Sequence, residues 1–316
     1  MPVGAQGSAV KIYTKQETTE GVLPTGNWDQ IPVFNFGLME SQDLVQDFIL
    51  SAAPNRDAAD PFLNLLRVQG DVRVPIESVH IGRWLKLLLG SPTTSGTTNF
   101  THLFKSGSVA LPSNAFEKAF TDIGRYHTYL GARANTLQVS IDPEGAAEAT
   151  IGMMALAAPG RTGASSGGTP VVTPFTRFFK PQGSIKRGGT TLAAVTGGSF
   201  TFSNGMELVA TVRDDLRMEG VDFGQSTAEG TVNVRYTDDT LNTAATSNTP
   251  ASMEYLLTIN ANLSLSFLFP RVFLQRAGVP VEGPTGTTAA HTFRAAYDST
   301  AQCLMQVTLK NQTATY

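Results

Sequence analysis

The chain of 316 residues contains a single cysteine and few charged side chains. Cys303 has no second thiol to pair with, so a disulfide framework and a thiolate metal cluster are both excluded. Only 16% of the residues are charged and the net charge is −3, whereas soluble domains carry roughly 25% charged residues. Because tight nucleic-acid binding needs clustered Lys and Arg, this balance disfavours a dedicated nucleic-acid binder.

Long apolar runs and catalytic spacings are also missing. No apolar run approaches the roughly 20 residues that span a bilayer. Met1–Val10 has neither the basic start nor the apolar core of an export signal, so we expect no membrane partner. Gly163–Gly167 fits the G-x-S-x-G pattern of a serine nucleophile, but Pro170 follows where a supporting helix is needed. No two histidines are four residues apart (His80, His102, His127 and His291). We predict a protein that is not an enzyme and needs no cofactor or metal.

Alternating apolar and polar residues dominate what is present. A period of two is typical of strands with one buried face. The clearest examples are Val72–Val74, Leu137–Ile141, Ser199–Phe202, Val232–Tyr236 and Leu263–Phe267. One stretch, Val79–Leu89, has helical spacing instead, with Ser78 as the expected N-cap and Gly90 as the C-terminal stop. The sequence predicts a mainly β protein with a short packed helix.

The two halves of the chain resemble each other around a polar central segment, Pro159–Pro170, which has the composition of a flexible linker. Three pairs of segments match in order, around Gly70 and Gly230, around Pro112 and Pro270, and at Leu137–Asp142 and Phe293–Asp298. We therefore predict two tandem modules, residues 1–158 and 171–316, joined by the linker 159–170. Thr240–Ser247 takes the place of the helix in the second module.

These segments resemble the tail tube proteins of long-tailed bacteriophages. The resemblance rests on the opening Tyr13–Pro32, on Val68–Val72, Leu87–Gly90 and Tyr129–Asn135, and on Gly197–Gly205, Phe269–Val272 and Val307–Asn311. It implies β-sandwich or half-barrel modules, each with one packed helix. Six modules would surround a lumen, and the rings would stack into a tube around the tape-measure protein.

The same resemblance implies a place in the virion tail, assembly in the bacterial cytoplasm, passage of double-stranded DNA, and contacts with tail terminator and distal tail proteins. A duplicated chain would supply six modules from three copies, so we expect a homotrimeric ring; a homohexamer is the alternative. Two other functions stay open. One is a different tail ring component on the same module, such as a terminator or a baseplate or distal tail protein, and the other is a ligand-binding β-protein.

Three groups of residues are candidates for this function. Polar members of the alternating strands are expected to line a neutral or acidic lumen, because lumen cations would hold passing DNA; they are Gln138, Ser140, Asn233, Ser264 and Ser266. Two prolines are expected where strands leave the barrel and meet other subunits, since proline is confined to strand edges and bulges; they are Pro112 and Pro270. The basic cluster near three phenylalanines is expected to form inter-subunit salt bridges, rather than a single-stranded nucleic-acid site; it comprises Arg177, Lys180, Lys186 and Arg187.

Overall fold

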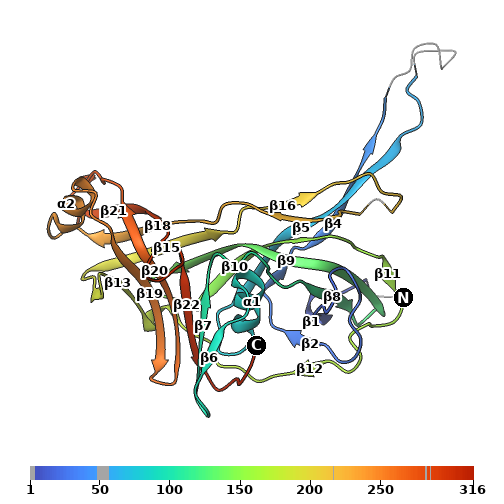
Figure 1. Ribbon diagram of the computed structural model, residues 1–316, viewed down its shortest axis with the longest axis horizontal. Helices are drawn as coiled ribbons and strands as arrows, with labels where there is room; N and C mark the ends of the chain where they lie inside the picture. Colours follow the sequence, from blue (N-terminus) through green and yellow to red (C-terminus); the bar gives the residue numbers. More distant parts are fainter. Residues whose placement is uncertain (1–3, 48–56, 216, 282, 285) are drawn as a thin grey trace.

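The computed structural model describes residues 4–47, 57–215, 217–281, 283–284 and 286–316. Strands dominate these residues, which confirms the predicted mainly β fold (Figure 1). The strands are β1 (Val10–Gln16), β2 (Asp29–Ile31), β3 (Asn35–Phe36), β4 (Met39–Val45), β5 (Phe62–Pro75), β6 (Thr93–Ser95), β7 (Phe100–Lys105), β8 (Asn114–Phe120), β9 (Arg125–Ile141), β10 (Glu148–Ala155), β11 (Arg161–Thr162), β12 (Val171–Val172), β13 (Gly183–Arg187), β14 (Thr190–Thr191), β15 (Val195–Ser203), β16 (Met206–Val209), β17 (Gly220–Phe223), β18 (Thr227–Arg235), β19 (Ala251–Asn260), β20 (Leu263–Leu274), β21 (Thr288–Ala295) and β22 (Gln306–Asn311). The helices are α1 (His80–Leu89) and α2 (Thr240–Thr246), with short 3-10 turns η1 (Gly7–Ala9) and η2 (Lys180–Gln182).

One antiparallel run of seven strands crosses both halves of the chain. Its order is β4–β5–β10–β9–β15–β18–β21, and the halves meet where β9 pairs with β15. The remaining large strands form two further groups. One consists of β1, β2 and β8 of the first half, and the other of β19, β20 and β22 of the second half with β7 of the first half paired to β22. Over the described residues the strand ladder does not close into a barrel.

A large apolar core fills the space behind this run and extends through both halves. In the first half α1 lies against β9, and Trp84 stacks on Phe116 with ring centroids 5.5 Å apart. In the second half aromatic rings replace the helix at the centre, with Phe200 lying 5.1 Å from the rings of both Tyr255 and Phe267. The helix α2 is more peripheral, and Leu241 is its one buried residue.

The predicted helix is confirmed, but its N-cap is not the expected one. Ser78 makes no cap; its hydroxyl accepts a hydrogen bond from the Thr176 backbone N–H at 3.0 Å. The Glu77 carboxylate caps the helix instead, accepting from the N–H groups of Val79 and Ile81 at 2.7 and 2.8 Å. A longer acidic side chain one residue earlier reaches the same free N–H groups that a serine would satisfy. Gly90 ends the helix at φ 92°, as predicted.

Hydrogen bonds and strand pairing hold the predicted linker, residues 159–170, along much of its length. Ser165 Oγ donates to the buried Glu117 carboxylate at 2.5 Å, and the Ser166 N–H donates to the same group at 2.7 Å. β11 within the segment pairs with β9, and β12 just after it runs parallel to β2. Linker mobility and the module boundaries stay predictions, although these contacts oppose free motion of the segment.

The strands of the two halves pair in the same order. In the first half the order is β4–β5–β10–β9–β8, and in the second it is β15–β18–β21–β20–β19. A helix follows the second of these strands along the chain in both cases. Both last pairs also have a bulge at the same place, with Asn114 and Phe116 facing Ala132 and Tyr129, and Ala251 and Met253 facing Val272 and Phe269.

The glycines that begin the sequence match lie at equivalent places in this order. A Cβ added at Gly70 of β5 would lie 2.1 Å from the carbonyl oxygen of Gly37, and one at Gly230 of β18 would lie 2.4 Å from that of Ser199. Each glycine therefore allows a neighbouring backbone to approach closely, that of Gly37 between β3 and β4 in one half and that of β15 in the other.

The other two sequence matches are wrong by one strand. Pro112 precedes β8 whereas Pro270 lies in β20, and β8 corresponds to β19 in the pairing order. Likewise Leu137–Asp142 ends β9 whereas Phe293–Asp298 begins in β21. Neighbouring strands of one sheet have the same alternation, so short segments match the adjacent strand as well as the equivalent one.

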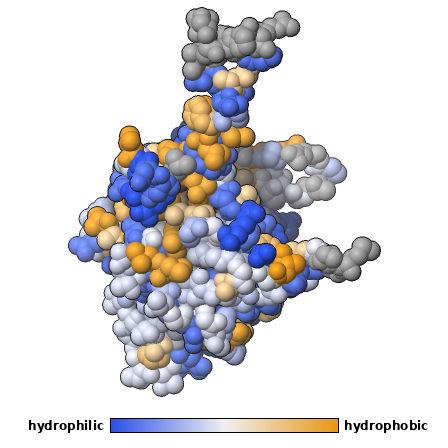
Figure 2. Space-filling view, turned by 90° about the vertical axis from the view of Figure 1, so that its right-hand side faces the viewer, coloured by the Kyte–Doolittle hydropathy of each residue, from blue (hydrophilic) through white to orange (hydrophobic). Residues whose placement is uncertain are grey.

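Two hairpin arms extend from the body. The β4–β5 arm is the longer, and Figure 2 shows apolar side chains gathered near its stem. The second arm is the separate β16–β17 hairpin, which lies between β15 and β18 along the chain.

Candidate functional site

A broad polar face on the seven-strand run is the candidate functional site. Alternate side chains of β9 enter the core, as Leu137, Val139 and Ile141 do, and the others point to the opposite face. Directly paired residues lie on the same side of a sheet, so the register extends this face across neighbouring strands. Its members include Arg67, Gln69, Asp71, Arg73, Glu148, Thr150, Thr136, Gln138, Ser140, Ser199, Thr201, Ser203, Glu229, Thr231, Asn233, Arg235, Thr288, Thr292 and Arg294.

The centre of the polar face is neutral. Residues 136–140 of β9 and 199–203 of β15 contribute only hydroxyl and amide side chains to it. Charges lie around this centre, on the flanking strands, at Arg133 beyond the β9 bulge, and at Lys180, which donates to Ser140 Oγ at 3.4 Å. Those charges include two opposite pairs, Arg73–Glu148 at 3.6 Å and Arg294–Glu229 at 3.8 Å. A neutral strip with paired charges beside it gives a passing polyanion few unpaired cations to bind.

Three of the five predicted lumen residues lie together on this face. Gln138 and Ser140 are on β9, and Asn233 is on β18, one strand beyond β15. Ser264 and Ser266 lie elsewhere, in the part of β20 that pairs with β19 and β22. There the Ser266 hydroxyl donates to Glu254 Oε1 at 2.6 Å. A lumen-facing role stays a prediction for all five residues, and the register gives Ser264 and Ser266 a separate surface.

Sequence reasoning missed most of the polar face. Thr201, Thr231 and Thr292 are neighbours across β15, β18 and β21, yet each lies in a stretch with the same alternation as every other strand. The signal available was the alternation of polar residues after Gly198 and around Gly230. Only the register reveals that Thr201 lies opposite Gln138 and that Thr231 and Thr292 continue the same face on the next strands.

A model of a known protein family provides the comparison that decides the class. The family described as phage tail tube protein matches residues 7–295. The chain belongs to this family. A search of curated protein sequences gave no match. A structural role in the phage tail follows from the membership.

The two predicted strand-exit prolines of this tail tube chain differ in setting. Pro270 lies at the β19–β20 bulge, between the part of β20 that pairs with β22 and the part that pairs with β21. It stands where the strand changes its partner, a position that proline tolerates because no ladder hydrogen bond is required there. Pro112 lies outside a strand, two residues before β8. Their inter-subunit roles stay predictions.

The predicted basic cluster is divided among partners within the chain. Lys180 pairs with Asp142 at 2.5 Å, and Lys186 pairs with Glu254 at 3.4 Å. The Arg177 guanidinium lies over the Phe34 ring, 5.1 Å from its centroid. Burial lowers the pKa of Arg187. An inter-subunit role for these four residues stays a prediction, and it would have to use charges that already have neighbours.

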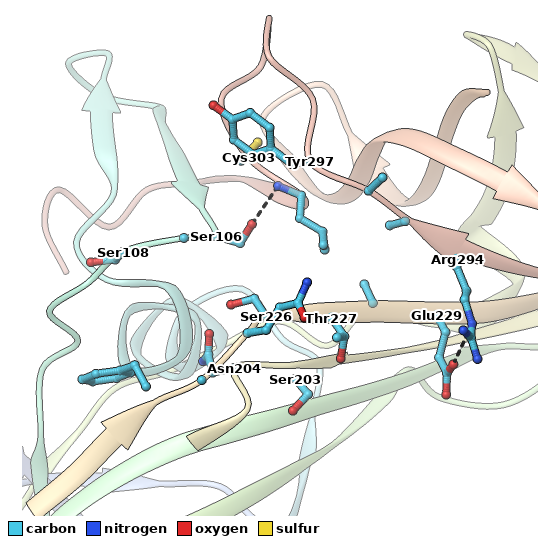
Figure 3. Close-up of a pocket in the computed structure, with 18 of the residues that line it drawn as sticks. Ser106, Ser108, Ser203, Asn204, Ser226, Thr227, Glu229, Arg294, Tyr297 and Cys303 are labelled. Carbon is cyan, nitrogen blue, oxygen red and sulfur yellow. Dashed lines mark hydrogen bonds and ion pairs between the residues drawn. The ribbon is translucent and has the colours of Figure 1, made fainter. Parts of the chain in front are cut away.

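An open hollow of about 1280 Å³ adjoins the end of the polar face (Figure 3). Ser203, Thr227 and Glu229 line one side, and the loop around Tyr297 and Cys303 lines the other. The Glu229–Arg294 pair at its edge is well exposed, with side chains 63% and 83% accessible. No group of three or more potential metal ligands occurs in the described parts of the chain.

Two buried carboxylates, Glu77 and Glu117, accept hydrogen bonds that hold neighbouring segments of the chain in place. Ser165, the serine of the G-x-S-x-G pattern, is hydrogen-bonded to Glu117 rather than to a histidine. Burial raises the pKa of Glu77 to about 7, although three backbone N–H groups and Arg83 oppose the shift. The helices described here are too short and too polar to cross a membrane.

Proposed function

We propose that the chain is the subunit of a phage tail tube whose lumen is lined by the polar sheet face. In this proposal stacked rings hold the tape-measure protein and later conduct double-stranded DNA. The neutral centre of the face supports the proposal, because a conduit must let a polyanion slide without holding it. The proposal refines the expected neutral or acidic lumen to a neutral one with paired flanking charges.

The dimensions of such a tube follow from the strand count. The first half contributes β4, β5, β10 and β9 to the polar face, and the second contributes β15, β18 and β21 with the end of β20 beside them. Four strands from each of six half-chains make about 24, which at ~4.8 Å spacing and ~45° tilt close at a diameter of roughly 50 Å. Inward side chains leave on the order of 40 Å, enough for a DNA duplex roughly 20 Å wide.

We infer that the halves are two copies of one module and that the ring is a homotrimer with pseudo-sixfold shape. The common pairing order, the common bulge and the equivalent glycines Gly70 and Gly230 support this inference. A homohexamer in which only one half lines the channel is the alternative. Partners in the complete tail would be further rings, the tape-measure protein, and the terminator and distal tail proteins. Assembly would take place in the host cytoplasm.

Images of the purified protein and its ring mass test the proposal. Negative-stain micrographs should show long hollow tubes, and native mass spectrometry of dissociating rings should give three chains. Single rings that never stack would favour a terminator or baseplate component instead. A monodisperse monomer at high concentration, with a small molecule bound in the hollow of Figure 3, would favour a ligand-binding protein.

A further inference from the structure

The junction between the two halves is a complete example of how two modules join. Past the β8–β9 pairing, which ends at Ala132, residues 136–141 of β9 pair with residues 198–203 of β15. The polar face continues across this junction because Gln138 lies directly opposite Thr201. The pairing of β9 with β15 therefore shows how one half of the chain can join another half, and it serves as a template for contacts between copies.

Each end of the seven-strand run lacks the partner that this template supplies. Gln69 of β5 faces Met39 of β4, just as Glu229 of β18 faces Thr201 of β15. Strands β3 and β4 thus hold the place of β15, but β5 is the one strand they pair with in the described part of the chain. Met39 is 55% exposed.

The opposite end has the complementary gap. The β19–β20 pairing ends at Val272, as the β8–β9 pairing ends at Ala132. Residues 276–281 hold the place of 136–141 but belong to no strand, and Val281 is 79% exposed. This end and the β4–β5 arm lie on opposite sides of the molecule in Figure 1.

The two hairpin arms give a second, independent correspondence. Met206 of β16 pairs with Phe223 of β17, and Leu44 of β4 pairs with Leu63 of β5. Met206 follows Thr201 by five residues, and Leu44 follows Met39, the equivalent of Thr201, by the same five residues.

The β16–β17 arm packs against the first half of its own chain, at a site we call the Met206 seat, whereas the described part of the β4–β5 arm leaves its apolar side chains exposed. Met206 is buried against Leu111 and Met154 of the first half, and its N–H donates to Asn135 Oδ1 at 2.9 Å. Leu44 and Leu63 are 65% and 53% exposed. Phe223, the counterpart of Leu63, is itself 38% exposed, so the contrast rests on Met206 and Leu44. An apolar side chain that is buried in one arm and exposed in its counterpart indicates a missing partner surface.

We propose that copies of this chain join head to tail by repeating their internal junction. Residues 36–41 of one copy pair antiparallel with the segment 276–281 of the next, and the β4–β5 arm lies over β20 and β21 of that copy. Leu44 then occupies the counterpart of the Met206 seat, near Gln275 and the Arg294 edge of the hollow. The contact is heterologous, so it closes into a ring when the rotation between copies permits. It rests on the proposed tube function and defines its subunit interface.

Photo-cross-linking from two positions tests the interface in the full-length protein. A photoreactive phenylalanine analogue replaces Met39 in one variant and Leu44 in another. Equal amounts of ¹⁴N- and ¹⁵N-labelled chains are mixed before assembly, so mixed-isotope adducts identify contacts between copies. We expect the Met39 probe to be captured by residues 272–294 and the Leu44 probe by residues 271–304, in mixed-isotope adducts.

A control probe at Ile123 has similar exposure, 45%, but lies in the β8–β9 turn away from both edges. It should give no adduct in residues 271–304. Tubes whose Met39 and Leu44 probes capture other regions would overturn the interface while leaving the tube function standing. An absence of assembly by the unmodified chain under all conditions would overturn both.

Discussion

The two hairpin arms have matching strand pairs but differ in what covers them. The β16–β17 arm is seated on the first half of its own chain, where Met206 is 4% exposed, whereas the counterpart Leu44 is 65% exposed. Because the backbone pairing is the same, the difference lies in the presence of a partner surface rather than in the arm itself. One arm contributes to the stability of the chain, and we infer that the other is reserved for assembly.

Replacing Met206 and its counterpart Leu44 by alanine should separate the effect on stability from the effect on assembly. Of the variants considered, Met206→Ala should lower the free energy of unfolding the most. Met206→Ala should lower the free energy of unfolding of the monomer by about 2–4 kcal/mol, since it opens a cavity against Leu111 and Met154. Leu44→Ala should change it by less than about 0.5 kcal/mol, because the side chain is exposed. Urea unfolding measures the first effect and light scattering measures tube formation. A Leu44→Ala variant that assembles as readily as the parent would contradict the comparison.

The helix N-termini of the two halves should respond to pH in opposite directions. Burial raises the pKa of Glu77 to about 7, so the folded state retains a proton that the unfolded chain loses near its ordinary pKa of 4.5. Stability from this group is greatest below that value and falls as the pH rises to about 7, by up to about 3 kcal/mol. Glu77→Gln should flatten this part of the stability profile, measured by urea unfolding at several pH values.

Asp238 at the start of α2 provides the opposite case. A hydrogen bond from Thr240 lowers its pKa, so its contribution is present above the ordinary pKa and is lost as the pH falls through the folded value. Asp238→Asn should therefore lower stability above the ordinary pKa of the group and have little effect at acidic pH, where Asp238 of the parent is itself protonated. A Glu77→Gln profile that still declines between pH 4.5 and 7 would assign that decline to another group.

The equivalent glycines should have similar and smaller effects. Gly70→Ala and Gly230→Ala each place a methyl group against a backbone carbonyl, so each should cost about 1–3 kcal/mol. Gly220→Ala is the matched control, because nothing lies within 4 Å of the added carbon. Thermal unfolding checks all three. A cost at only one of Gly70 and Gly230 would weaken the case for equivalent modules.

Lysines on the neutral strip should leave the chain stable and affect transport. Gln138→Lys and Thr201→Lys should change the free energy of unfolding by less than about 0.5 kcal/mol, yet slow DNA ejection because repeated rings accumulate phosphate contacts. Asn262→Lys in the exposed β19–β20 turn is the control for added charge. Ejection rates from phage with assembled mutant tails provide the measurement. Unchanged rates with both strip variants would show that this face does not line the channel.

Some features of this protein follow from the sequence alone. Period-two alternation predicted the strands, and the apolar spacing of Val79–Leu89 with Gly90 predicted α1, because both patterns are local. The segment Thr240–Ser247 is helical as α2 although its composition is rich in Thr and Asn. The family resemblance is confirmed over residues 7–295.

Tertiary structure decided which strands are neighbours and therefore which polar residues form a surface. Alternation tells that Gln138 and Ser264 each point away from the core, but it does not tell that β9 pairs with β15 while that part of β20 pairs with β22. Pairing is set by contacts between residues far apart in the chain, and adjacent strands with the same alternation are interchangeable to a sequence pattern. For this reason Pro112 matched Pro270 in sequence, whereas the hydrogen-bonded register relates β8 to β19.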